Sequence, residues 1–170
     1  MKNSTKKLVI VINGRSGVGK DTLIGFAAKK YKVLNVSSID RVKEIALFAG
    51  WDGIKDERGR KLLIDMKAAL VSYDDLPTKY MADAAADFMK SGGQIMFVHI
   101  REAAEIRKFC AAVPCKTLLV TREAAEKFNL NQDDALADFK YDYTFENDKP
   151  IEESGADFVE LIKKIRGKLL

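Results

Sequence analysis

Residues 8–22 read LVIVINGRSGVGKDT, and this stretch decides the fold. Its first five residues are a continuous run of large aliphatic side chains, which is typical of a parallel strand covered by helices on both faces. Three glycines follow, and apolar residues then recur at Leu23, Ile24 and Ala27. This spacing predicts a helix over 21–30, so we expect the stretch to fold as strand, glycine-rich turn and helix.

The turn Gly14–Lys20 fits the pattern G-x-x-x-x-G-K of a phosphate-binding loop, or P-loop. Glycines adopt backbone angles that side chains disfavour, and they let main-chain N–H groups approach phosphate oxygens. The helix that begins near Gly19 directs unpaired N–H groups and its positive dipole end at the same anion, and Lys20 adds a full charge. We expect this loop to bind a nucleoside triphosphate, with ATP as the cofactor, through Gly14, Ser16, Gly17, Val18, Gly19 and Lys20.

Asp21 stands where such loops usually carry a Ser or Thr whose hydroxyl ligates magnesium. Magnesium prefers oxygen ligands and keeps part of its hydration shell, so a carboxylate can hold it directly or through water. We therefore expect Mg²⁺ as the metal and Asp21 as the residue that binds it. Thr22 faces about 100° further round the helix. It is expected to pack or to contact the α-phosphate.

The rest of the chain alternates short apolar segments with amphipathic ones, and this predicts a parallel sheet with helices on both faces. We expect a single α/β domain over 1–170, a three-layer sandwich around a five-stranded parallel sheet. The stretch between residues 36 and 94 is too long for one crossover, so we expect a helical insertion at about 37–92. The further strands are expected at 33–36, 94–100, 116–120 and 141–145, and the further helices at about 38–49, 56–71, 76–90, 101–112 and 151–170, with Ser37 and Ser38 as N-cap of the first of these.

The composition is that of a globular protein, with 47% hydrophobic and 32% charged residues among 170. A net charge of +4 suits a protein that handles anionic small molecules, and because no dense Lys/Arg run occurs we expect no nucleic-acid partner. No apolar run reaches the roughly 20 residues that span a bilayer. We expect no membrane partner and a cytoplasmic location.

Few residues suit metal or redox chemistry. His99 is the only histidine, so a His/Cys metal cluster cannot be assembled. Cys110 and Cys115 lack a spacing such as C-x-x-C, and we expect two reduced thiols near a helix end and a strand start.

On these residues the sequence resembles the P-loop nucleotide kinases of the nucleoside monophosphate kinase-like group. Within that group it is most similar to the branch with a GKDT or GKDS loop, which includes phage-type deoxynucleoside monophosphate kinases and animal phosphomevalonate kinases. The further segments that match in order are SSIDRVK at 37–43, KDER at 55–58, RE at 101–102, Arg122 and YDYTFEND at 141–148. The resemblance implies a P-loop NTPase fold with acceptor-binding and LID insertions.

The resemblance also implies roles for residues at the strand ends, which meet at one edge of a parallel sheet. The segment 37–92 would hold the acceptor, and about 122–140 would form a LID. Cations around the transferred group are what phosphoryl transfer requires of the protein. The implied catalytic residues are Lys20, Arg101, Arg122 and Asp40; the implied substrate-binding residues are Ser38, Asp40, Lys43, Arg58 and Arg101; Asp21, Thr22 and Asn147 join the loop in binding nucleotide.

Three functions stay open. The favoured one is an ATP-dependent kinase that transfers the γ-phosphoryl group to a small, already phosphorylated acceptor, with a (deoxy)nucleoside monophosphate as the preferred candidate. The second is a kinase for another metabolite, such as a phosphomevalonate-like or dephospho-CoA-like acceptor. The third is a nucleotide-binding module without transfer activity. Asp21 and a LID-like segment with a single arginine, Arg122, favour this last hypothesis.

Overall fold

The computed structural model of the protein describes residues 6–126 and 139–168. The strands are β1 Leu8–Asn13, β2 Val33–Ser37, β3 Ile95–His99, β4 Lys116–Thr121 and β5 Tyr143–Glu146. The helices are α1 Lys20–Ala28, α2 Asp40–Phe48, α3 Glu57–Asp74, α4 Leu76–Lys90, α5 Ala103–Ala112, α6 Glu123–Glu126 and α7 Ile151–Gly167. All five expected strands are confirmed.

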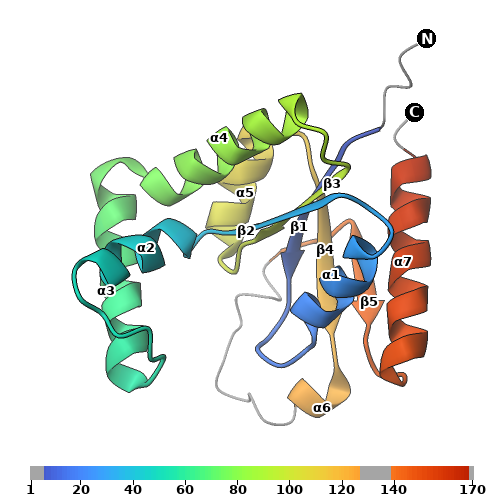
Figure 1. The fold of residues 1–170 in the computed structure, drawn as a ribbon, viewed down its shortest axis with the longest axis horizontal. Helices are drawn as coiled ribbons and strands as arrows, with labels where there is room; N and C mark the ends of the chain where they lie inside the picture. The colour runs from blue at the N-terminus through green and yellow to red at the C-terminus, as the bar shows by residue number, and fades with distance from the viewer. Residues whose placement is uncertain (1–5, 127–138, 169–170) are drawn as a thin grey trace.

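The strands form one parallel sheet in the order β2-β3-β1-β4-β5 (Figure 1). β1 lies in the centre, paired with β3 on one side and β4 on the other. Every residue of β1 is buried, as the continuous aliphatic run predicts for a strand covered on both faces. The predicted five-stranded parallel sheet is therefore confirmed.

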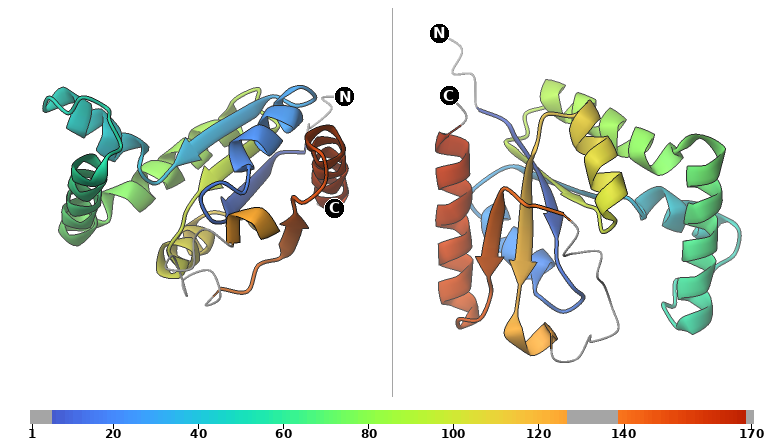
Figure 2. Two further views of the ribbon diagram at one scale, coloured as in Figure 1. Left: turned by 90° about the horizontal axis from the view of Figure 1, so that it is seen from below. Right: turned by 180° about the vertical axis from the view of Figure 1, so that it is seen from behind.

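Helices cover both faces of the sheet (Figure 2). Successive strand residues point to opposite faces, so Ile10 and Ile12 pack with α1 and α7, whereas Val9 and Val11 pack with α4 and α5. Phe158 of α7 lies at the centre of the first core, with its ring centroid 6.1 Å from that of Phe97. The result is the expected three-layer sandwich.

The helices α2, α3 and α4 connect β2 to β3, and α2 and α3 lie beside the sheet rather than over it (Figure 1). Among the described residues, the core between α2 and α3 has three buried side chains, Val42, Ala46 and Leu63, with partly buried apolar residues packed against them. We call the segment from Asp40 to Asp74 the side helices. α4 differs from them, because it packs on the sheet as part of the second core.

The expected N-cap of α2 is wrong in part. The N-cap residue is Ile39, which has no side-chain oxygen and makes no side-chain cap bond. Ser37 instead exchanges contacts with the first turn, because its N–H donates to Asp40 Oδ2 at 2.7 Å and its Oγ accepts from Ile39 N at 3.4 Å. Ser38 turns away from the helix and contacts Lys67.

Within residues 6–126 and 139–168, no helix combines the length and the apolar content needed to cross a membrane.

Candidate active site

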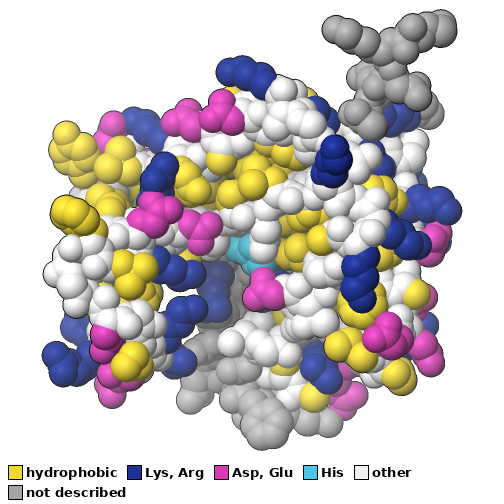
Figure 3. Space-filling model, viewed as in Figure 1, with side chains coloured by type: hydrophobic (Ala, Val, Ile, Leu, Met, Phe, Trp, Pro, Cys, Tyr) yellow, Lys and Arg dark blue, Asp and Glu magenta, His cyan; other side chains and the backbone are white. Residues whose placement is uncertain are grey.

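The loop after β1 lies at the switch point of the sheet. From β1 the chain builds β2 and β3 on one side and then β4 and β5 on the other. In open parallel sheets, ligands bind beyond the carboxyl ends of the strands at such a point. Figure 3 shows a hollow on this face, with the histidine (cyan) above it and Lys and Arg side chains along the wall on the side of α2 and α3.

The P-loop has a backbone that requires glycine. Gly14, Gly17 and Gly19 have φ angles of 146°, 84° and 88°, in the region that side chains avoid. Two of these glycines are also packed closely: a Cβ on Gly14 would lie 2.3 Å from the Val120 carbonyl oxygen, and one on Gly19 would lie 2.6 Å from Asn147 Nδ2. The loop is therefore pressed against β4 and against the residues that follow β5.

Lys20 lies across this loop. Its Nζ donates to the carbonyl oxygens of Gly14 at 2.5 Å and of Arg15 at 3.1 Å. Burial lowers the pKa of Lys20 to about 8, and the nearby positive charge of Arg101 contributes to this shift. Lys20 is still mainly an ammonium at pH 7, and it shares the edge of the sheet with Arg101.

Asn13 joins three parts of the site, and the sequence analysis did not single it out. It is 1% exposed, its Oδ1 accepts from Gly14 N at 2.8 Å, and its Nδ2 donates to Arg101 O at 3.0 Å and to the Tyr141 hydroxyl at 2.9 Å. Asn13 thus fixes the start of the P-loop to the end of β3. The only sequence signal is its place between the buried strand and the first glycine.

Asn147, expected to contact the nucleotide, holds the other end of the loop. Its side-chain amide donates to Val18 O at 2.7 Å, and its main-chain N–H donates to Thr121 O at 2.8 Å. Val18 is 1% exposed and anchors the loop in the core. In this structure Asn147 positions the loop, and it lies directly beside Gly19.

Asp21 lies on the first turn of α1 with its side chain 90% exposed, and its Oδ1 is 3.9 Å from His99 Nε2. His99 Nε2 also lies 2.8 Å from Asn35 Oδ1. Burial is the main cause that lowers the pKa of His99, so the imidazole is neutral at pH 7. Thr22 is exposed as well, so the expected packing of Thr22 is not found.

The residues present fit a partly hydrated Mg²⁺. An exposed carboxylate beside the P-loop is an oxygen ligand of the kind that magnesium takes together with water and phosphate. In the described ranges there is no group of three His, Cys, Asp or Glu side chains that could hold a metal unaided. Asp21 would therefore share the ion with the phosphates of the nucleotide.

On the acceptor side, some of the expected residues follow the carboxyl end of β2. Ser38 is 6% exposed, and its N–H donates to His99 O at 3.2 Å. Besides burial, which is the largest cause, the charge of Asp40 raises the pKa of His99 and that of Lys43 lowers it. Arg58 and Arg122 are exposed, on the first turn of α3 and directly after β4.

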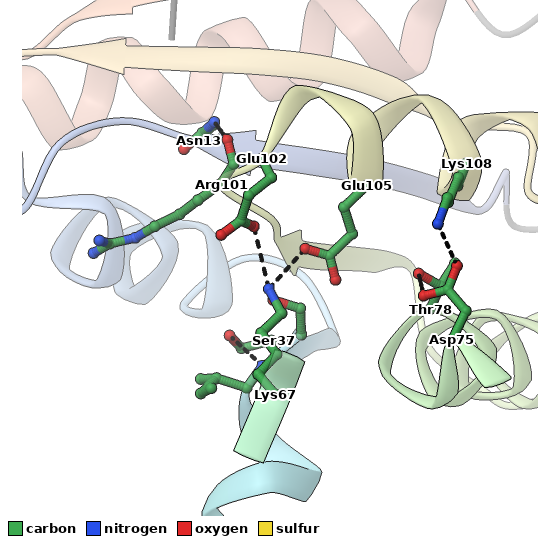
Figure 4. Close-up of polar contacts among 11 residues, drawn as sticks. Asn13, Ser37, Lys67, Asp75, Thr78, Arg101, Glu102, Glu105 and Lys108 are labelled. Carbon is green, nitrogen blue, oxygen red and sulfur yellow. Dashed lines mark hydrogen bonds and ion pairs between the residues drawn. The ribbon is translucent and has the colours of Figure 1, made fainter. Parts of the chain in front are cut away.

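A second charged group lies next to these residues, and only its member Glu102, in the RE pair at 101–102, was noted in the sequence. Lys67 of α3 donates to Glu105 Oε2 at 2.8 Å, to Glu102 Oε2 at 3.1 Å and to Ser38 Oγ at 3.2 Å (Figure 4). We call Lys67, Glu102 and Glu105 the latch, because they join α3 to α5. Figure 4 shows Arg101 pointing away from these carboxylates.

Glu105 is the buried member of the latch. Its side chain is 10% exposed, and its Oε1 is buried without a hydrogen-bond partner in the described structure. Burial raises the pKa of Glu105 to about 7, and the neighbouring Glu102 adds to the shift. No sequence signal marks this group, because Lys67 and Glu105 lie 38 positions apart and each resembles an ordinary helix-surface charge.

The LID-like segment is described only at its ends. The expected segment 122–140 begins with Arg122 and the short helix α6, and residues 127–138 lie outside the described residues. The expectation that this segment forms a LID stays a prediction.

Comparisons with known proteins bear on the fold. No family model matches the sequence, and no curated protein matches it significantly. A sugar kinase from Janibacter sp. superposes with a TM-score of 0.55 at 11% identity, covering 92% of this chain and 95% of its own. A gluconokinase from Sinorhizobium meliloti gives 0.53 at 9%, covering 97% and 96%. A shikimate kinase from Aquifex aeolicus gives 0.51 at 10%, covering 95% and 99%.

These similarities extend over nearly the whole length of both chains, and at such low identities they concern the fold. Together with the parallel sheet and the glycine loop after its central strand, they show that the chain has the fold of the P-loop kinases.

Proposed function

We propose that this protein is an ATP-dependent small-molecule kinase. One observation carries the proposal: the Lys20 ammonium lies across a glycine loop at the switch point of the sheet, with the charge of Arg101 close to it. This arrangement suits a polyphosphate, because main-chain N–H groups, a helix N-terminus and two cations act on one place. The three solved structures compared above are named as kinases, which supports transfer rather than binding alone.

In the proposed reaction, an acceptor oxygen attacks the γ-phosphorus of ATP while the bond from this phosphorus to the bridging oxygen breaks, and ADP leaves. The protein needs to position the two substrates and to neutralise charge, rather than to form covalent bonds. Lys20 would leave the carbonyl oxygens of Gly14 and Arg15 for the outer phosphates. Arg101 would stabilise charge on the transferred group from the side of β3.

Magnesium, when bound, would neutralise charge on the phosphates. Asp21 is the residue that we propose holds it.

We propose that the acceptor is anionic and already phosphorylated, with a (deoxy)nucleoside monophosphate as the first candidate. The Lys and Arg side chains along the wall of the hollow support an anion (Figure 3). Ser38, Asp40 and Lys43 are the proposed contacts nearest the P-loop, and Arg58 is the proposed outer contact. An acceptor that is a phosphate monoester needs no strong base.

A screen of acceptors with coupled detection of ADP tests this function. The panel should contain nucleoside and deoxynucleoside monophosphates, phosphomevalonate, dephospho-CoA, shikimate and gluconate, each at equal concentration with Mg·ATP. Turnover with a monophosphate nucleotide is the expected result. Turnover with another acceptor only would mean that this compound, and not a nucleoside monophosphate, is the substrate. ATP binding without any transfer would favour a nucleotide-binding module.

A further inference from the structure

The two cysteines of the chain meet in the fold. Cys110 lies in the last turn of α5, and Cys115 directly precedes β4. Both are free and half-buried, and their Sγ atoms lie 2.8 Å apart. A disulfide bond is about 2.05 Å long, so the sulfurs need to approach by roughly 0.8 Å to bond.

We propose that Cys110 and Cys115 are a reversible modification site, at which a small-molecule disulfide of the glutathione class converts the pair into an intrachain disulfide. The proposal stands on the position of the two sulfurs and on their partial exposure, which lets a small oxidant reach them. The spacing C-x-x-x-x-C predicts no such site by itself, because the fold brings the two together across the turn between α5 and β4.

The two thiols differ in how easily they ionise, and this difference determines which of them reacts first. Cys115 donates its S–H to Cys110 Sγ, which lowers the pKa of Cys110, and the same contact together with burial raises the pKa of Cys115. The Asp142 carboxylate opposes ionisation of both thiols, and Lys116 favours ionisation of Cys115. Since the thiolate is the nucleophile, Cys110 attacks first and Cys115 resolves.

The steps balance as thiol–disulfide exchange. The Cys110 thiolate attacks one sulfur of the small disulfide, forms a mixed disulfide and releases one thiolate, which takes up a proton. Cys115 then gives its proton to solvent and attacks Cys110 Sγ, which releases the second small thiol. The two protein thiols are oxidised to one disulfide, and the small disulfide is reduced to two thiols.

This site lies at the opposite edge of the sheet from the P-loop. Cys115 precedes β4, whereas Gly14 follows β1, and β1 and β4 are parallel. Oxidation would tie the end of α5 to the start of β4 without touching Lys20 or Arg101. The inference is therefore independent of the proposed kinase function.

The test uses the full-length protein equilibrated with glutathione disulfide and then analysed by intact mass, peptide mapping and thiol titration. The wild type should lose both thiols and two hydrogen atoms, and dithiothreitol should restore them. Cys115→Ser should stop at a single glutathione adduct on Cys110. Cys110→Ser should react about tenfold more slowly than Cys115→Ser, because it lacks the activated thiol.

Three outcomes would overturn the inference. One is a wild type that carries two glutathione adducts, and another is a product joined between chains. The third is a folded protein that keeps both thiols under conditions where the urea-unfolded chain reacts completely. Equal rates for the two serine variants would overturn the order of attack. Thermal unfolding of each variant serves as the control for folding, and the oxidised wild type should unfold at a higher temperature than the reduced one.

Discussion

The P-loop and the side helices are held in place by different means. The P-loop is anchored in the core by Val18 and tied by Asn13 and Asn147 to the ends of three other segments. The side helices share a small core and expose large apolar residues, with Phe48 94% exposed. Polar contacts of the latch join them to α5.

This difference follows from what each region has to do. Binding phosphate through main-chain N–H groups requires a backbone that is ordered before the ligand arrives. Holding an acceptor requires side chains. Their positions depend on how segments that are distant in the sequence pack against one another.

Lys20→Ala should have the largest effect. Removing the ammonium from the loop is expected to lower kcat/KM for ATP. The expected loss of transition-state stabilisation is about 3–4 kcal/mol, since the charge acts directly on the transferred phosphates. Steady-state turnover with coupled detection of ADP measures it. Lys30→Ala, at an exposed position just after α1, is the matched control and should leave the kinetics unchanged. Equal kinetics for the two variants would show that Lys20 does not act on the phosphates of ATP.

Arg101→Ala should lower kcat/KM if the guanidinium stabilises developing charge. The expected loss of transition-state stabilisation is about 2–4 kcal/mol. Arg101→Lys should recover part of this loss, because it restores the charge without the planar fork. A loss below about 0.5 kcal/mol in the alanine variant would show that Arg101 only contributes its main-chain carbonyl to Asn13.

Lys67→Met should destabilise the fold by about 2–3 kcal/mol, because it leaves the buried Glu105 without its cationic partner. Urea unfolding at pH 9 measures this, because Glu105, with a pKa of about 7, is then ionised in the folded wild type. Lys61→Met on the same helix is the control: its ion pair with Asp65 is exposed, so its removal should cost less than about 0.5 kcal/mol. Similar costs for both variants would contradict the latch.

The latch also predicts a dependence of stability on pH. The pKa of Glu105 rises from 4.5 to about 7 in the folded protein, so the folded state binds the proton more tightly than the unfolded state. Its stabilising contribution is complete below about pH 4.5 and is lost as the pH rises through about 7. Compared with Glu105→Gln, the wild type should lose roughly 2 kcal/mol of unfolding free energy between pH 5 and pH 8. Urea midpoints of both proteins at the two pH values measure this loss. An equal change in midpoint for the two proteins would argue against a raised pKa of the buried Glu105.

The smallest predicted effect concerns Asp21. If its carboxylate helps to hold magnesium, Asp21→Ala should raise the Mg²⁺ concentration for half-maximal turnover about tenfold, near 1.4 kcal/mol. Asp83→Ala, at an exposed position on α4, is the matched control. An unaltered magnesium titration for Asp21→Ala would assign the metal to other oxygens.

The fold could be predicted from local patterns because the inner strands β1 and β3 are buried, and their continuous apolar runs differ clearly from their surroundings. The P-loop could be predicted for the same reason: glycine, lysine and helix are contiguous in the chain. Residues 8–22 include the strand, the glycine turn and the start of the helix, so no distant segment is needed to predict their structure.

The latch could not be predicted in this way. Lys67 and Glu105 meet only because α3 folds back toward α5, and each lies among other surface charges in the sequence. Asn13 has the same character, since its partners Arg101 and Tyr141 come from distant segments. The cap of α2 shows the limit at short range: the Ser37 N–H donates to the Asp40 carboxylate, whereas the Ser38 hydroxyl accepts from Lys67 of the distant helix α3.

Calorimetric titration of the full-length protein with ADP and ATP in the presence of magnesium, at pH 7 and at pH 9, tests the central claim most directly. We expect saturable uptake of one nucleotide per chain at pH 7. We expect weaker binding with proton uptake at pH 9, because the free Lys20, with a pKa of about 8, must regain its proton to meet the phosphates. No saturable heat with either nucleotide at pH 7 would contradict the assignment of a phosphate site to the P-loop.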